Sequence, residues 1–427
     1  MRDTRPTKAR SAQAKAGRKI APAETGDHVE AVELCSSVES WFHGAARDLP
    51  WRTLAGAAIA PGWRRDPYRS LVSEAMLQQT QVSRVVERFV QFMERFPTVS
   101  VLAEASEHDV LAMWAGLGYY RRARNLHAAA RAIAQQFGGR MPRDVAELQR
   151  LPGIGPYTAG AIASMAGGER VPLVDGNVVR VLLRVAAREG NAGDADTMKW
   201  TWRRAGELVS HAGDPGAFNE GLMELGALIC KPVNPTCGTC PLRDRCQARA
   251  AGLQDVIPSP KKEATRSCVY CAAVVVVDDQ GRVLLEQRGE SGMWAAMWQT
   301  PTLETSDAPA TSRRVKKWIG ERTRLPAPLP GVERVTSFIH ETTHRHMVFD
   351  VWRVHLQGAA EGNANDARSN VAGRWLQPPE AMAMPVSNAQ RRVLTLGVAS
   401  VPDVPGRVKR PPRARRGEAR IMDGQPR

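Results

Sequence analysis

A group of four closely spaced cysteines constrains the fold of this chain more than any other feature. They are Cys230, Cys237, Cys240 and Cys246, in the pattern Cys-x6-Cys-x2-Cys-x5-Cys. In a cytosolic chain, such a group binds a metal more often than it forms disulfides. Zinc sites usually pair two Cys-x-x-Cys motifs, whereas this stretch has one. A 4Fe-4S cluster held by four thiolates therefore fits better than zinc.

The length and charge of the chain favour several domains and a polyanionic partner. Its 427 residues exceed one typical core, which predicts two domains with tails. The net charge of +15 points to nucleic acid, although the excess of arginine can equally reflect genomic base composition. No apolar run is long enough to span a membrane, and the N-terminus lacks the apolar core of a secretion signal. We expect a bacterial cytoplasmic protein associated with the nucleoid.

Changes in composition suggest where the domains begin and end. Residues 1–27 and 399–427 are basic and lack apolar periodicity, which predicts disordered arms. Such arms are either simply solvated or add a sequence-independent grip on DNA. Between them we expect a helical domain over 28–250, a linker rich in proline and charge over 251–267, and an α+β domain over 268–398.

The stretch LPGIGPYTAG predicts a tight turn that opens a helix. Gly153 and Gly155 allow close approach to the backbone, and the helix that follows presents unpaired N–H groups at its positive end. Such a turn suits an anion. An ordinary turn between two helices is equally compatible with this short motif alone.

Two acidic residues stand out in apolar surroundings. Residues 67–97 read as one helical region, and Glu74 lies on the line that continues into Val85 and Phe89, so we expect it to be half-buried. A solvated helix face is the alternative. Asp175 follows an apolar run and precedes a predicted helix over 178–188, where it either caps that helix or serves chemistry as well.

Together these motifs resemble the endonuclease III superfamily of helix-hairpin-helix DNA glycosylases. SEAMLQQTQV, GLGYYRRARNLH and FNEGLMELGALIC further resemble the MutY family within it, and the likeness extends over residues 32–246. The resemblance implies a helical glycosylase domain with a 4Fe-4S cluster, followed by an α+β, Nudix-like domain. It also implies action, as a monomer, on double-stranded DNA with adenine opposite 8-oxoguanine or guanine, as the first step of base excision repair.

One position separates the members of this superfamily. Those that also cleave the strand carry a lysine nucleophile two residues after the second glycine of the hairpin, and here that residue is Tyr157. No lysine occurs between Lys19 and Lys199, so this part of the domain offers no amine for a Schiff base. We therefore expect hydrolysis of the glycosidic bond without strand cleavage.

The resemblance also implies roles for individual residues. Glu74 is the general acid that protonates adenine N7, and Asp175 stabilises the positive charge on the sugar, with Tyr157 as its hydrogen-bonding support. Tyr119 wedges into the duplex, although core packing is the alternative for this tyrosine. The implied substrate-binding residues of this domain are Arg47, Trp51, Arg52, Leu77, Gln79, Thr80, Tyr119, Gly153, Gly155, Asn177 and Glu220. Residues 53–65 form a longer connection than the family's usual one.

The second half resembles the Nudix-like domain of the MutY family. The segment CAAVVVVDD, a turn over 279–281 and RVLLEQR predict a β-hairpin, with Cys268 and Cys271 near its buried start. The paired glutamates that hold magnesium in a Nudix hydrolase are missing, so nucleotide hydrolysis is not expected. Where the family reads 8-oxoguanine with Phe-Ser-His, this chain has Thr342, Thr343 and His344. An exposed polar strand face is the alternative for the histidines here.

Two other functions deserve comparison with adenine excision. A strand-cleaving lyase or a thymine-type glycosylase is opposed by Tyr157 and by the missing lysines. A non-catalytic iron–sulfur protein that only binds DNA would keep its role after Glu74→Gln. The presence of both acids within complete motifs argues against that function.

Overall fold

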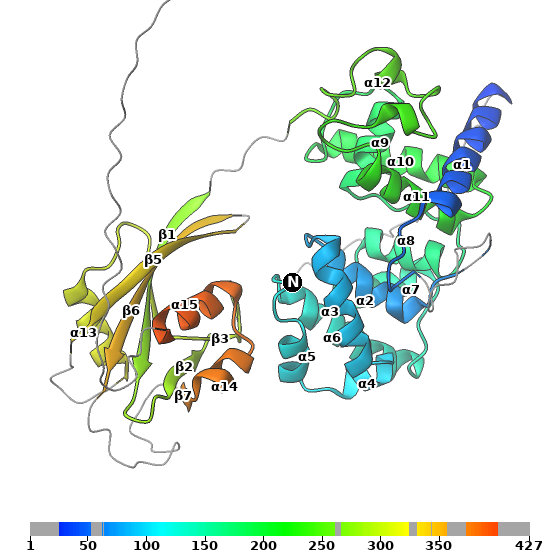
Figure 1. Cartoon of the computed structure of the whole chain (residues 1–427). Coiled ribbons are helices and arrows are strands. Elements are labelled where there is room, and N and C mark those ends of the chain that lie inside the picture. Colours follow the sequence, from blue (N-terminus) through cyan, green and yellow to red (C-terminus); the bar gives the residue numbers. More distant parts are fainter. Residues whose placement is uncertain are drawn as a thin grey trace, which may run out of the picture. The chain divides into compact units, whose positions relative to one another are not determined.

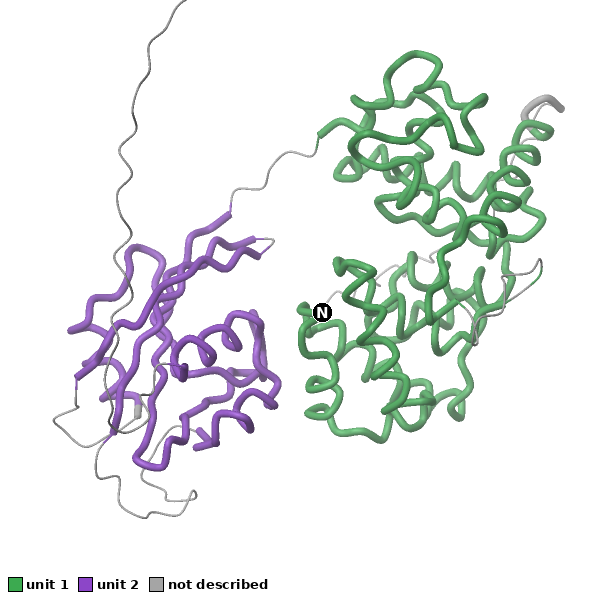
Figure 2. Tube along the Cα trace, in the orientation of Figure 1, with its two compact units in different colours: residues 1–264 green, residues 265–427 purple. Residues whose placement is uncertain are grey.

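The computed structural model describes residues 25–52, 62, 64–260, 266–323, 331–342, 344–356 and 373–399. The chain divides into two compact units, Met1–Ala264 and Thr265–Arg427 (Figure 2). Within the described residues, no helix combines the length and the apolar character that a membrane crossing requires.

The described part of unit 1 is helical (Figure 1). Its elements are α1 (Thr25–Ala45), α2 (Pro67–Leu77), α3 (Val82–Arg95), α4 (Val99–Glu104), α5 (Glu107–Met113), α6 (Arg121–Phe137), α7 (Val145–Arg150), α8 (Pro156–Met165), α9 (Gly176–Val185), α10 (Ala195–His211), α11 (Pro215–Leu228), the 3-10 turn η1 (Cys237–Thr239) and α12 (Gln247–Ala250). The single helical region predicted over 67–97 is wrong, because α2 and α3 are separated at residues 78–81. Gln79 has a φ of 55° there, which an α-helix does not accommodate.

Helices α7 and α8 form the predicted hairpin around residues 151–155. Gly153 has a φ of +75°, and a Cβ atom on it would lie 2.4 Å from Cβ of Asn125, so only glycine fits. Gly155 caps α8, and Pro156 occupies its first turn, where the missing N–H costs nothing. The sequence prediction of a turn followed by a helix is confirmed.

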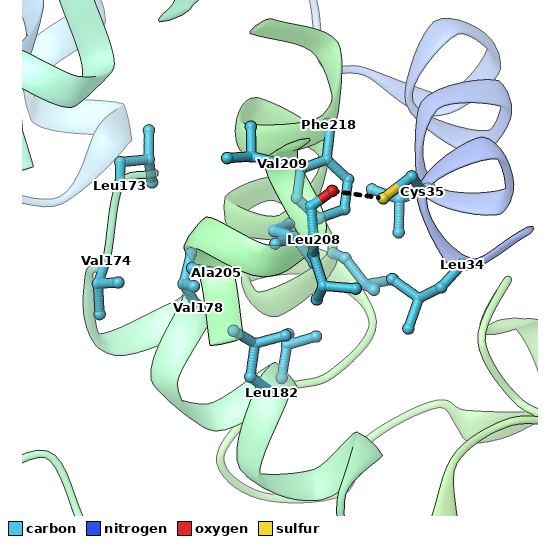
Figure 3. Packing of buried hydrophobic residues seen from close by; sticks show 14 of the residues in the cluster. Leu34, Cys35, Leu173, Val174, Val178, Leu182, Ala205, Leu208, Val209 and Phe218 are labelled. Atoms are coloured by element: carbon cyan, nitrogen blue, oxygen red, sulfur yellow. Dashed lines mark hydrogen bonds between the residues drawn. The ribbon is translucent and has the colours of Figure 1, made fainter. Parts of the chain in front are cut away.

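A buried apolar cluster joins α1, α8, α9, α10 and α11 (Figure 3). Cys35 is fully buried in it and its thiol donates to the carbonyl of Leu208 at 3.2 Å, which confirms the expectation that Cys35 lies in the core. Helix α11 approaches α9 closely because it carries Gly226, whose added Cβ would lie 2.6 Å from Cβ of Asn177. This close packing places the start of α9 beside α11.

Residues 251–260, which the sequence assigns to the linker, pack on unit 1. Ile257 is 3% exposed within the same apolar cluster, and the N–H of Ser259 donates to the carbonyl of Gly190 at 2.9 Å. The apolar side chain of Ile257 explains this packing, since its burial is favourable while its charged neighbours stay in water.

Unit 2 is a mixed sheet with helices on both faces. Its elements are β1 (Ser267–Val277), β2 (Val283–Gln287), β3 (Trp298–Gln299), β4 (Thr302–Thr305), α13 (Ser312–Thr323), β5 (Glu333–Glu341), β6 (Arg345–His355), β7 (Gly373–Leu376), α14 (Pro378–Ala383) and α15 (Asn388–Val398). The strand order is β3-β2-β1-β6-β5, with β1 parallel to β6. Strands β1 and β2 form the predicted hairpin, in which Val277 pairs with Val283.

The alternation along β1 builds two cores in unit 2. Ala273 and Val275 pack with α14 and α15, whereas Val274 and Val276 face α13 on the other side of the sheet (Figure 1). Cys271 is buried near the start of β1, as expected, whereas Cys268 is only half-buried. The structure thus consists of a helical domain followed by an α+β domain, which confirms the fold class predicted from the sequence.

Candidate active site and cluster site

The carboxylate of Glu74 is buried between three elements of unit 1. It lies on α2 with a residue exposure of 2%. The hydroxyl of Tyr157, in the first turn of α8, donates to its Oε2 atom at 2.7 Å, and Nη1 of Arg65 lies 3.8 Å from Oε1. Burial raises the pKa of Glu74, while Arg65 and the Tyr157 hydrogen bond oppose that rise. The solvated helix face is excluded for this residue.

Tyr157 supports a different acid from the one expected. Its hydroxyl donates to Glu74 and lies 3.3 Å from the sulfur of Met223, instead of bonding Asp175. The reason is that α8 packs on α2, while both oxygens of Asp175 already accept hydrogen bonds from α9. Burial and the nearby Glu74 hold the pKa of the Tyr157 phenol above its usual value, so the phenol remains a donor.

Asp175 caps α9, which is one of the two roles predicted for it. Its Oδ1 accepts from the N–H of Val178 at 2.7 Å, and its Oδ2 accepts from the amide of Asn177 at 2.8 Å. Burial raises the pKa of Asp175, and these hydrogen bonds oppose the rise. The cap fixes the carboxylate without removing it from the site, because Asp175 is near enough to Glu74 and Tyr157 to raise the pKa of both.

A chain of hydrogen bonds links Asp175 to the first cysteine of the cluster loop. The amide oxygen of Asn177 accepts from Nη2 of Arg180 at 2.8 Å, and Nε of Arg180 donates to the carbonyl of Cys230 at 2.7 Å. Asn177 is therefore hydrogen-bonded to Asp175 on one side and to Arg180 on the other, and it orients the Asp175 carboxylate.

Alternating buried charges extend from Glu74 towards the surface. Arg52 bonds both Glu220 and Glu224 on α11, and Arg65 contacts Glu220 as well. Arg47 donates to both oxygens of Glu224 at 2.7 and 2.8 Å. Although burial alone would raise it, the hydrogen bonds from Arg47 and Arg52 lower the pKa of Glu224 to about 2. This network fixes the face of α11 that carries Glu220 and Glu224.

Sequence reasoning missed three residues of this site, namely Arg65, Met223 and Glu224. Glu224 lies four residues after Glu220 on one face of α11, a spacing that offered a signal. Arg65 ends the long connection after Arg52, and no periodicity marks it. Its Nε and Nη1 atoms have no hydrogen-bond acceptor among the described residues.

Of the remaining residues expected to bind substrate, one is buried in the core and the others lie at the end of α2 or in loops. Trp51 is buried and packs edge-on against Phe89 at 5.5 Å, so it belongs to the core. Leu77, Gln79 and Thr80 lie at the end of α2 and in the loop after it. Tyr119 is 49% exposed, whereas Tyr120 is buried, which excludes core packing for Tyr119.

The four cysteines of the pattern line one pocket together with the side chains of Arg184, Arg243 and Arg249. No group of three or more histidines, cysteines or acids in the described residues is arranged to hold a single metal ion. Four thiols around one pocket are the type of ligand set that holds an iron–sulfur cluster. Nη1 of Arg184 donates to the sulfur of Cys230 at 3.3 Å.

In unit 2 the expected reader residues lie at the turn between β5 and β6. The hydroxyl of Thr342 accepts from the N–H of Arg345 at 3.0 Å, and His344 is exposed. Thr343 lies outside the described residues. His340 is half-buried, with its ring 5.9 Å from that of Trp294, and burial lowers its pKa.

Comparison with known proteins defines the class. Residues 72–206 match the model of the HhH-GPD superfamily base excision DNA repair proteins, and residues 272–396 match that of the NUDIX domain. The structure of a thermostable thymine-DNA glycosylase is 27% identical with a TM-score of 0.45, covering 53% of this chain and 99% of that one. Unit 1 therefore belongs to the class of helix-hairpin-helix base excision repair glycosylases.

Curated relatives narrow the class further. The adenine DNA glycosylase of Homo sapiens is 33% identical over 417 residues, covering 86% of this chain and 74% of the relative. That of Buchnera aphidicola subsp. Schizaphis graminum is 34% identical over 260 residues, covering 60% and 74%. The chain belongs to the adenine DNA glycosylase family. Glycosylases of the endonuclease III and MutY type generally bind an iron–sulfur cluster.

Proposed function

We propose that this protein hydrolyses the glycosidic bond of adenine opposite 8-oxoguanine or guanine in duplex DNA and so initiates base excision repair. The observation that carries the proposal is the buried Glu74 carboxylate, held by Tyr157 and flanked by Arg65. The family membership of the chain supports the same activity.

The target adenine must leave the duplex before Glu74 can reach it. Flipping costs a few kcal/mol, and less for a mispaired base. Tyr119 is exposed and suited to fill the space that the adenine leaves, with Gln79 and Thr80 beside it. The turn at Gly153 and Gly155 offers backbone N–H groups to a phosphate. Nε of Arg65, which has no hydrogen-bond acceptor among the described residues, offers a buried donor to a ring nitrogen of the base.

Glu74 then acts as the general acid. Its raised pKa keeps the carboxyl protonated closer to neutral pH, so that it can donate its proton to adenine N7. Once the proton has moved, Arg65 and the Tyr157 hydroxyl stabilise the carboxylate that remains. Protonated adenine leaves as a neutral base.

Asp175 stabilises the sugar as the bond breaks. The sugar gains positive charge in the transition state, and a fixed negative charge lowers that barrier. The N–H of Val178 and the amide of Asn177 hold the Asp175 carboxylate and favour its charged form. Water then completes the hydrolysis, which leaves an abasic site.

The cluster site serves DNA binding in this proposal. Cys230, Cys237, Cys240 and Cys246 would hold a 4Fe-4S cluster, which when bound supplies a rigid centre for the loop. Arg243 and Arg249 are exposed on the same segment, where they can contact phosphates. The protein acts as a monomer in this scheme.

Unit 2 is proposed to read the base opposite the adenine. Thr342, Thr343 and His344 occupy the place of the family's reader, and Thr342 and His344 lie at a hairpin turn. Helix α13 carries Glu321 as its one glutamate, which is insufficient for the magnesium set of a Nudix hydrolase. Recognition of 8-oxoguanine is therefore favoured over nucleotide hydrolysis.

The test is single-turnover cleavage of duplexes with adenine opposite 8-oxoguanine, guanine or thymine, developed with and without alkali. We expect strand breaks only after alkali, fastest opposite 8-oxoguanine. Equal rates opposite 8-oxoguanine and guanine would refute the reader assignment. Absence of cleavage in every duplex, by protein with its cluster intact, would refute adenine excision.

A further inference from the structure

A buried arginine, Arg122 on α6, joins two loops of unit 1. The side chain is 9% exposed, and its guanidinium donates to residues on both sides. Its contacts are the carbonyls of Ala75 (2.8 Å), Met76 (2.7 Å), Leu117 (3.2 Å) and Gly118 (3.1 Å) and the hydroxyl of Thr80 (3.0 Å). Ala75, Met76 and Thr80 belong to the end of α2 and the loop after it. Leu117 and Gly118 belong to the loop before α6. One side chain thus sets the distance between the loops.

Both loops hold an ordinary residue in the left-handed conformation. Gln79 has a φ of 55° and Tyr119 a φ of 48°, and such angles cost free energy for any residue with a Cβ atom. They persist only where the surroundings fix the backbone. Arg122 supplies that restraint for both loops at once, since its partners lie on both sides of Gln79 and directly before Tyr119 in the sequence.

The charge of Arg122 is compensated in an unusual way. Within the described residues it forms no ion pair with a carboxylate, and its hydrogen-bond partners are carbonyls and a hydroxyl. Its guanidinium carbon lies 5.4 Å from the ring centres of Tyr119 and Trp114. Burying a cation among such neutral groups is costly, and burial lowers its pKa to about 10. If the contact had only a structural role, apolar side chains could make it at a lower cost in free energy.

We propose that Arg122 is a positioning residue for base flipping, which locks the Gln79 loop and the Tyr119 loop into one rigid surface that enters the duplex. The inference rests on the proposed function. Stacking by Arg122 under the Tyr119 ring sets the angle of the wedge, and its hydrogen bonds to the other loop set the width of the gap that the wedge fills.

The experiment compares Arg122→Met and Arg122→Lys with the wild type in two assays. The first is single-turnover adenine excision. The second is the fluorescence of 2-aminopurine at the target position, measured in a Glu74→Gln background so that the base stays attached. We expect Arg122→Met to slow excision about 10- to 100-fold and to abolish the fluorescence rise, with Arg122→Lys intermediate.

Two controls separate positioning from folding. Ile133→Ala also destabilises α6, but lies far from both loops along the helix, and Arg124→Met removes a neighbouring arginine that pairs with Glu107 instead. Thermal melting of each variant provides the common scale. The fluorescence rise should survive in both controls.

A double-mutant cycle with Tyr119→Ala gives the sharpest result. Because Arg122 acts partly through Tyr119, the double variant should be slower than Tyr119→Ala by a smaller factor than Arg122→Met is slower than the wild type. Multiplying effects, or a loss that Ile133→Ala reproduces at equal melting temperature, would overturn the inference. Absence of excision by the wild type would instead refute the proposed function, while the fluorescence comparison would still decide the role of Arg122.

Discussion

At the scale of single residues, the roles of the two acids depend on the groups that surround them. Glu74 and Asp175 are both carboxylates from which burial removes water, yet their partners differ. Glu74 faces a phenol and a guanidinium, whereas Asp175 accepts a backbone N–H and an amide. The sequence could place both acids in the site, but it could not say which one Tyr157 supports, because that depends on how α8 packs against α2.

Tyr157→Phe tests the environment of Glu74 through the pH dependence of excision. The acid must be protonated, so the single-turnover rate should be constant below the pKa of Glu74 and fall as pH rises through it. Loss of the hydroxyl removes a hydrogen bond that lowers this pKa. The fall should therefore move to higher pH, with a rate about 10-fold lower on the plateau.

Tyr68→Phe is the matched control, since the Tyr68 hydroxyl is also buried but donates to the carbonyl of Phe96. It should leave the pH profile of excision unchanged. A Tyr157→Phe profile that stays in place, or moves to lower pH, would contradict the assignment of Tyr157 to Glu74.

Asp175 combines capping with chemistry, and two substitutions separate them. Asp175→Asn keeps a capping oxygen, so the free energy of unfolding should change by less than about 1 kcal/mol. Excision should nevertheless fall about 1000-fold, because the negative charge is lost. Asp175→Ala should lose the same activity and about 1–2 kcal/mol of stability. Urea unfolding and single-turnover rates check both, and an active Asp175→Asn would exclude the electrostatic role.

At the scale of elements, the helix-hairpin-helix turn depends on one of its two glycines for folding. Gly153 has a positive φ and no room for a Cβ atom, whereas Gly155 has neither restriction. Gly153→Ala should lower the free energy of unfolding by about 1–3 kcal/mol, and Gly155→Ala by less than about 0.5 kcal/mol. Urea titration measures both. Equal losses would show that the turn is not what restricts Gly153.

The elements also show where prediction from sequence reaches its limit. Apolar periodicity located the buried face of α3 correctly, with Val85, Phe89 and Met93 buried. It could not reveal the break after α2, because residues 78–81 contain neither glycine nor proline to mark the point where the backbone turns at Gln79. Periodicity could not identify Arg65 either. A backbone hydrogen bond from the N–H of Arg65 to the carbonyl of Met165 helps to hold this residue beside Glu74.

At the scale of the whole molecule, the chain combines a catalytic unit with a second unit of Nudix type. Motifs spread along the sequence were sufficient to predict this arrangement, since each unit carries its own pattern of periodicity. The spacing of the four cysteines likewise predicts the proposed cluster site. The proposed reader of unit 2 rests on fewer residues, and Thr343 lies outside the described part of the chain.

The distribution of lysine gives a prediction for the whole catalytic unit. No lysine occurs between Lys19 and Lys199, so an abasic product should meet no amine beside Asp175. Incubation with substrate duplex and borohydride should yield no covalent protein–DNA adduct on a denaturing gel. A strong adduct that forms during excision would contradict a purely hydrolytic mechanism.

The most direct test of the central claim is to identify the base that the enzyme releases. Chromatography after a single turnover on a duplex with adenine opposite 8-oxoguanine should show free adenine, close to one equivalent per active site, for the wild type. Glu74→Gln should release at least about 100-fold less in the same time. Release of thymine from a T:G duplex without release of adenine, or unchanged release by Glu74→Gln, would contradict the account.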